Sequence, residues 1–138
     1  MGVVVFDTDV LIGFMSPTDA HHAEAVDWMR EATRPQTERW ICAVNYSELL
    51  VAPFREGRQG HVRAMLVDFS FGVARVDAEL AEQAASVRAR TSLKLPDAYA
   101  LATAVQLEVR GRSDVRLATF DKKVLQAHRD LHPVDPGS

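Results

Sequence analysis

Short runs of apolar, β-branched residues alternate along this chain with longer segments of helical periodicity, and this alternation limits the folds open to it. Residues 3–6 read Val-Val-Val-Phe, a continuously apolar run that is typical of a strand buried on both faces. Further strands are predicted at residues 40–43, 72–76 and 115–119. Because strands and helices alternate, we predict an α/β fold: a three-layer α/β/α sandwich with a central parallel sheet of four or five strands.

The segments between these runs have helical spacing. The clearest is the helix predicted over residues 97–109, where Ala98, Leu101, Ala102 and Val105 recur at i, i+3, i+4 and i+7. The other predicted helices cover residues 10–34 with a break at 16–18, residues 45–55 with strain or an end near Pro53, residues 61–69, residues 77–90, and a short segment from about residue 121.

The chain has 138 residues, the length of one domain, and we expect a single domain over residues 1–138 with a loose tail from about residue 134. One cysteine excludes an internal disulfide framework. The longest apolar stretch, residues 10–15, is far shorter than the roughly 20 residues that span a bilayer. No secretory signal is visible, so we expect a soluble cytoplasmic protein without membrane association.

Acidic residues stand where the predicted strands end or helices begin. Asp7 follows the first strand and Asp121 follows the fourth. Glu48 lies early in the helix after the second strand, and Asp97 opens a later helix. Because the carboxyl ends of parallel strands line one edge of an α/β sheet, where ligands bind, these four acids can converge there.

Each acid also has an ordinary structural explanation. Residues 45–48, Asn-Tyr-Ser-Glu, form a capping-box pattern in which Glu48 bonds back to the amide of the capping residue. Asp97 and Asp121 stand where a carboxylate offsets the positive end of a helix dipole. If all four acids converge, a metal-binding site explains them better than four separate structural roles. Two carboxylates about 4 Å apart repel by about 4 kcal/mol at an effective dielectric near 20, so they do not stay together without a reason. A cation or bound protons must hold such a cluster, and oxygen ligands without Cys or paired His select Mg²⁺ or Mn²⁺.

Four segments, taken in order, resemble a PIN domain. They are Val-Val-Val-Phe-Asp7-Thr8-Asp9-Val-Leu-Ile, Ser47-Glu48-Leu49, Asp97-Ala-Tyr-Ala-Leu-Ala-Thr-Ala, and Leu-Ala-Thr119-Phe-Asp121. The length and layout are similar to those of the VapC toxins of type II toxin–antitoxin pairs, and the resemblance covers essentially the whole chain.

The resemblance implies a metal-dependent endoribonuclease that uses one or two Mg²⁺ ions, for which Mn²⁺ can substitute. The residues that would carry catalysis and bind metal are Asp7, Glu48, Asp97 and Asp121. Divalent ions supply a deprotonated water and stabilise the leaving oxygen, so no His base or Ser nucleophile is needed. Thr8 and Thr119 match positions where the family has a small or hydroxyl residue. Asp9 stands where many members have Asn or Ser, which leaves open a direct metal ligand, an acid that supports the ligands, or a helix cap.

The resemblance also implies partners. VapC-like toxins usually form homodimers, and a small antitoxin neutralises them by lying across the helices and the groove of the active site. Residues 10–15 and 45–54 can form an apolar groove for such a partner, or can equally belong to the core.

The charge is distributed unevenly. The net charge of −3, from 16 basic and 19 acidic residues, argues against a protein that binds nucleic acid through bulk positive charge. Residues 88–129, however, hold nine basic and only four acidic residues. The basic side chains that we expect to hold an RNA backbone are Arg88, Arg90, Lys94, Arg112, Arg116, Lys122 and Lys123. An ordinary solvated surface is the alternative.

The aromatic residues and the paired histidines indicate no site of their own. Aromatic residues are scattered at strand and helix-core spacings, which does not indicate a base-stacking platform. His21 and His22 have no matching metal-ligand pattern, and we expect them to be solvated on a polar helix face.

Two other functions stay open. Residues 6–9, Phe-Asp-Thr-Asp, also fit the opening of a haloacid-dehalogenase-type phosphatase with Asp7 as nucleophile, although the usual Gly-Thr does not follow and little room is left for a cap domain. The second is a catalytically silent PIN-like module that binds RNA or a partner. A silent site has no reason to keep mutually repelling carboxylates, which favours the enzyme.

Overall fold

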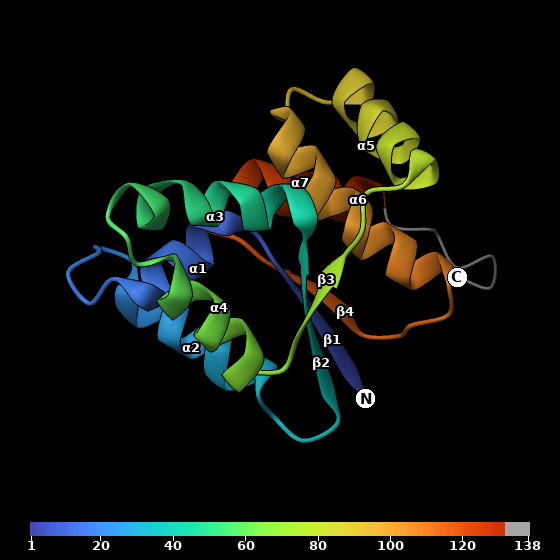
Figure 1. Cartoon of the computed structure of the whole chain (residues 1–138). Coiled ribbons are helices and arrows are strands. Elements are labelled where there is room, and N and C mark those ends of the chain that lie inside the picture. Colours follow the sequence, from blue (N-terminus) through green and yellow to red (C-terminus); the bar gives the residue numbers. More distant parts are fainter. Residues whose placement is uncertain (132–138) are drawn as a thin grey trace.

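A parallel sheet of four strands forms the centre of residues 1–131, the part of the chain that the computed structural model describes. The predicted tail from about residue 134 lies outside these residues. The strands are β1 (Gly2–Phe6), β2 (Thr37–Cys42), β3 (Phe71–Ala74) and β4 (Val115–Ala118), in the spatial order β3-β2-β1-β4 (Figure 1). All three pairings are parallel. The prediction of a parallel α/β fold is confirmed.

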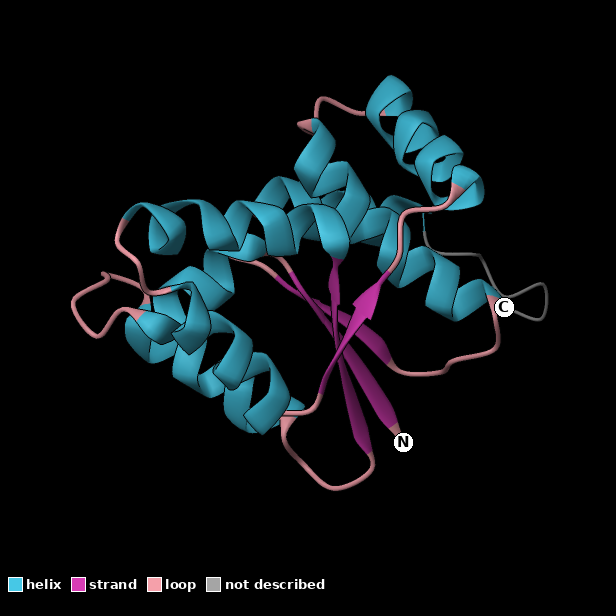
Figure 2. Ribbon diagram, viewed as in Figure 1, coloured by secondary structure: helices cyan, strands magenta, loops and turns pink. Residues whose placement is uncertain are grey.

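Helices cover both faces of the sheet (Figure 2). The helices on one side are α1 (Thr8–Met15), α2 (His22–Ala32), α3 (Ala43–Arg55) and α4 (Gln59–Asp68); those on the other are α5 (Ala78–Arg90), α6 (Leu95–Val109) and α7 (Lys122–Leu131). Side chains of β1 alternate between the two layers, because Val4 and Phe6 pack against the first group of helices while Val3 and Val5 pack against the second. β1 is therefore buried on both faces, as its unbroken apolar run predicts.

The helix α3 differs from the sequence prediction at its start. It begins at Ala43, directly after β2, with Cys42 as its N-cap and no side-chain capping bond. The predicted capping box is therefore wrong, because Asn45 lies inside the helix and is fully buried. The helix ends two residues beyond Pro53, as expected from the strain that proline imposes on a helix.

None of the helices in residues 1–131 combines the length and the apolar character needed to cross a membrane.

Candidate active site

Asp7 lies at the end of the central strand and is fixed by three neighbouring groups. Its backbone N–H donates to the Ala118 carbonyl at 2.8 Å, which continues the β1–β4 pairing by one residue. The carboxylate caps α1, since Oδ1 accepts from the Thr8 amide at 2.9 Å. Oδ2 accepts from the Thr119 hydroxyl at 3.0 Å. Asp7 is only 3% exposed, so its orientation is set by the fold.

The loop that follows β4 supplies Asp121 and contacts Asp9. The Thr119 hydroxyl accepts from the Asp121 amide at 3.1 Å, while the Phe120 amide donates to Asp9 Oδ2 at 3.0 Å. Asp121 Oδ1 in turn accepts from the Lys123 amide at 2.9 Å, at the start of α7. Asp9 Oδ1 is buried and has no hydrogen-bond partner among the described residues. Asp9 therefore fixes the loop through one oxygen, while the other is buried without a hydrogen bond to any described residue.

Glu48 and Asp97 reach the same edge from α3 and α6. Glu48 Oε1 accepts from the Thr8 hydroxyl at 2.9 Å, so Thr8 links the start of α1 to α3. Asp97 lies in the first turn of α6.

Asn45 connects these two helices, and the sequence reasoning missed it as a site residue. Its side-chain amide donates to the Pro96 carbonyl at 3.1 Å and to Glu48 Oε1 at 3.4 Å. The signal available in the sequence was the position of Asn45 three residues before Glu48. We interpreted that spacing as a capping box, although it also places both side chains on one face of a helix.

The carboxylates affect one another electrostatically. Burial first, and then the charges of Asp9 and Asp97, raise the pKa of Asp7 to about 7, while hydrogen bonds from Thr119 and Thr8 oppose the rise. Burial also raises the pKa of Asp97, with further contributions from Asp121, Glu48 and Asp9. The pKa of Asp9 is raised as well, by burial above all and to a smaller extent by the charge of Asp121. The structure thus brings the four predicted acids and Asp9 within electrostatic reach of each other.

A family model for the PIN domain matches residues 4–130, nearly the whole chain. The chain belongs to the PIN domain family. No curated protein sequence matches it significantly.

Solved structures similar to this PIN domain come from toxin–antitoxin systems, and several of them are described as VapC or VapBC. A toxin–antitoxin complex from Klebsiella pneumoniae is 29% identical, with a TM-score of 0.67 over 88% of this chain and 89% of that one. VapC20 from Mycobacterium tuberculosis, a toxin that cleaves the sarcin–ricin loop, is 19% identical with a TM-score of 0.68, over 90% of this chain and 94% of that one. VapBC-1 from nontypeable Haemophilus influenzae is 19% identical with a TM-score of 0.63, over 96% and 97%. The last two likenesses show the fold alone.

PIN domains are generally metal-dependent, and the donor chemistry of this site fits a hard cation. Among residues 1–131, no group of three or more Asp, Glu, His or Cys side chains is arranged to hold an ion by itself. Mg²⁺ does not require such a cage, since it keeps several waters and is held through one or two carboxylates together with substrate phosphates. The raised pKa of Asp7 and the unpartnered Asp9 Oδ1 are features that a divalent cation would relieve.

The predicted basic residues separate into two groups in the PIN domain. One group surrounds an open groove of about 690 Å³ between the end of α5 and α7, which Arg90, Lys122 and Lys123 line. Lys94 also belongs to this side of the molecule, because it caps α6 and its charge acts on Asp97. Arg88, at the end of α5, donates to the Leu93 carbonyl at 2.6 Å and so holds its own loop.

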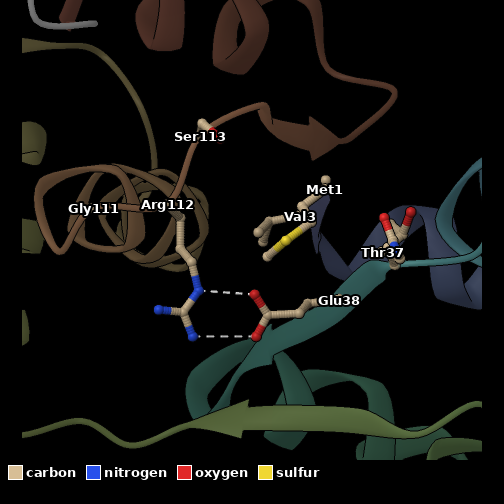
Figure 3. Close-up of a pocket in the computed structure, with 9 residues that line it drawn as sticks. Met1, Val3, Thr37, Glu38, Gly111, Arg112 and Ser113 are labelled. Atoms are coloured by element: carbon tan, nitrogen blue, oxygen red, sulfur yellow. Dashed lines mark hydrogen bonds and ion pairs between the residues drawn. The ribbon is translucent and has the colours of Figure 1, made fainter.

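The second group lies elsewhere. Arg116 is in the middle of β4, 3.6 Å from Glu31 and stacked over Trp28. Arg112 lines a cavity of about 420 Å³ beside the starts of β1 and β2 (Figure 3). Asp7 follows the other end of β1, so the cavity and the acids lie at opposite ends of the strands. At the cavity, the Arg112 guanidinium makes two hydrogen bonds to Glu38, at 2.8 and 3.2 Å. The structure therefore does not bring Arg112 or Arg116 together with the acids.

Proposed function

We propose that this PIN domain is a metal-dependent endoribonuclease that hydrolyses RNA phosphodiester bonds, and that it is the toxin of a VapBC-type toxin–antitoxin pair. The observation that carries the proposal is the coupling of Asp7, Asp97 and Asp121 at the carboxyl edge of the sheet. Burying acids that repel one another lowers the stability of the fold. Such a cluster is stabilised only when it binds a cation or protons. Similarity to toxin–antitoxin structures supports the assignment.

Asp7, Asp97 and Glu48 would hold one or two Mg²⁺ ions, or Mn²⁺ in their place, and Asp121 would either join them or position the attacking water. When bound, the metal would supply Lewis acidity, which favours a deprotonated water and stabilises charge on the leaving oxygen. The chain contributes orientation: Thr119 and the Thr8 amide fix the Asp7 carboxylate, and the Thr8 hydroxyl fixes Glu48. Preset ligands avoid reorganisation when the scissile phosphate binds.

The basic groove between α5 and α7 supports RNA as the substrate. Lys122 and Lys123 follow Asp121 directly, and both are exposed. A strand whose phosphate lies at the acids can therefore continue into the groove, where Arg90 and Arg129 supply further positive charge. In this arrangement positive charge is needed only beside the site, which agrees with the net charge of −3.

A second groove, formed by α1, α3 and α4, is the candidate surface for a neutralising antitoxin. It encloses about 490 Å³ and is lined by Ile12, Met15, Leu49, Pro53 and Glu48. Ile12 is 45% exposed and so presents apolar surface to this groove. Because Glu48 borders this groove, a segment lying there would also cover part of the active site. We also propose that this chain forms a homodimer.

The phosphatase alternative requires Asp7 as an accessible nucleophile. Asp7 is almost fully buried, which restricts the approach of its carboxylate to a phosphorus atom. The nuclease proposal uses the same oxygens as ligands, a role that tolerates burial.

Cleavage of RNA in the presence of Mg²⁺ or Mn²⁺ tests the proposal, with Asp97→Asn compared with the wild type. Asp68→Asn is the matched control, since Asp68 is exposed at the end of α4 and outside the acidic cluster. We expect Asp97→Asn alone to abolish cleavage, without lowering the melting temperature. Full cleavage by Asp97→Asn would contradict the proposed site. A wild type that binds RNA but never cleaves it would instead support the silent module.

A further inference from the structure

An aromatic pair lies beside the acids, formed by two residues that are far apart in the sequence. The His21 ring stacks on the Phe120 ring, with centroids 4.8 Å apart and an interplanar angle of 27°. Phe120 stands between Thr119 and Asp121, and its amide donates to Asp9, so the backbone of Phe120 belongs to the loop that carries the acids. The sequence indicated no stacking platform, because neither residue has an aromatic neighbour at helical or strand spacing.

Neighbouring groups hold the backbone of both residues and one side of the Phe120 ring. The Phe120 amide donates to Asp9, and the Phe120 ring packs over Gly13, where an added Cβ would lie 3.4 Å from Cε2. The His21 amide donates to Asp19 Oδ1 at 2.8 Å. The next residue, His22, bonds through Nδ1 to the Gly13 carbonyl at 2.8 Å. The stack is therefore preorganised and does not depend on the two rings alone.

The His21 side chain is nevertheless 55% exposed. Within the described residues its ring has one ionic neighbour, Glu24, at 3.9 Å. The ring of the next residue, His22, bonds to the Gly13 carbonyl, whereas more than half of the His21 side chain is open to solvent and to a ligand. The prediction that both histidines are solvated agrees with the exposure of His21, although it does not include the stacking on Phe120. It does not describe His22, whose ring bonds to the Gly13 carbonyl.

We propose that the His21–Phe120 pair is a stacking platform for a base of the RNA substrate, next to the scissile phosphate. This inference rests on the proposed ribonuclease function. It adds His21 as a residue that positions the RNA strand on the protein. Single-stranded RNA is recognised largely by stacking of unpaired bases on aromatic side chains, including His. Phe120 precedes Asp121, Lys122 and Lys123 in the sequence, so the proposed base contact, one acid and two exposed lysines come from one loop and the start of α7.

The test uses a short RNA with one cleaved bond, in which each nucleotide flanking that bond is replaced in turn by an abasic one. For the wild type, we expect one of these replacements to raise KM roughly tenfold to a hundredfold, the loss of one stacked base, with kcat little changed. His21→Ala should raise KM on intact RNA by a similar factor and lose all sensitivity to that abasic position. His21→Phe, which keeps a flat ring, should behave as the wild type.

The same RNAs are titrated against Asp97→Asn, with and without His21→Ala, so that binding is measured without cleavage. If the wild type cleaves no RNA, the proposed function fails, while the abasic dependence of binding still tests the platform. The platform is refuted if His21→Ala and the wild type depend on the abasic position in the same way. It is also refuted if His21→Ala lowers the affinity for intact and for abasic RNA equally and His21→Phe does not restore that affinity. Absence of any RNA binding refutes both proposals.

Discussion

Thr119 donates a hydrogen bond to Asp7 across 112 residues of sequence, with Oγ1 3.0 Å from Asp7 Oδ2. The same hydroxyl accepts from the Asp121 amide at 3.1 Å. One buried side chain thus sets the position of two of the proposed ligands, one at the end of β1 and one after β4. The pairing of these two neighbouring strands brings the three residues together.

Replacing Thr119 by Val tests this link, because valine keeps the shape and removes the hydroxyl. Two hydrogen bonds are lost, and we expect the free energy of unfolding to fall by about 1–3 kcal/mol. Cleavage of RNA should fall roughly tenfold to a hundredfold, the usual effect of losing a group that orients a metal ligand. Thr119→Ser retains the hydroxyl and serves as control. Normal cleavage by Thr119→Val would show that Asp7 needs no such support.

The raised pKa of Asp7 predicts how stability depends on pH in the absence of metal. Between its ordinary value of 3.8 and about 7, folded Asp7 holds a proton that the unfolded chain has lost. The free energy of unfolding should therefore fall as pH rises from about 4 to about 7 and then level off. Asp7 alone would account for a loss on the order of 4 kcal/mol. Urea denaturation in EDTA between pH 4 and pH 8 measures this.

Asp7→Asn is the matched variant for that measurement. Its amide can still accept from the Thr8 N–H, while the Thr119 hydroxyl can turn to accept from it. We expect Asp7→Asn to be more stable than the wild type at pH 8 in EDTA, with a shallower pH dependence, and to be inactive. Parallel pH profiles for the two proteins would mean that Asp7 is ionised throughout this range.

The sequence predicted the acidic site because parallel pairing leaves few alternatives. The strand before Asp7 is apolar throughout and so is expected in the interior of the sheet. Parallel strands beside it must have their carboxyl ends on the same side of the sheet as Asp7. This rule predicts that Asp121, which follows the fourth strand, lies near Asp7. It predicts the same for Glu48 and Asp97, because they lie in helices that begin at the carboxyl ends of the strands. Such reasoning needs only the order of elements, which hydrophobic periodicity supplies.

Features that depend on how elements pack were not predictable in this way. Whether Asn45 caps α3 or lies inside it depends on where that helix begins, and α3 begins at once after β2. His21 and Phe120 lie 99 residues apart in the sequence and meet only in the folded chain, where the Phe120 ring also lies against Gly13 of α1. Arg112 belongs to the basic stretch of the sequence, yet the turn before β4 places it at the opposite edge. A count of charges along the chain does not distinguish the two edges of a sheet.

Two glycines are predicted to respond oppositely to replacement by alanine. A Cβ on Gly72, in the edge strand β3, would lie 2.8 Å from the ring of Trp40, so Gly72→Ala must displace that ring. We expect a loss of about 1–3 kcal/mol in the free energy of unfolding. Gly60 lies in the first turn of α4 with nothing within 4 Å of such a Cβ, so Gly60→Ala should gain about 0.5 kcal/mol. A stabilised Gly72→Ala protein would contradict the Trp40 packing.

The salt dependence of RNA binding distinguishes the two groups of basic residues. Lys122 and Lys123 are exposed at the start of α7, beside Asp121, whereas Arg112 is paired with Glu38 at the other edge. For single strands, each phosphate contact adds about 0.7 to the slope of log affinity against log salt. Lys122→Gln with Lys123→Gln should therefore reduce that slope by about 1.4 and weaken binding at low salt, while Arg112→Gln leaves both unchanged. An equal loss in Arg112→Gln would place the RNA across the far edge of the sheet and away from the acids.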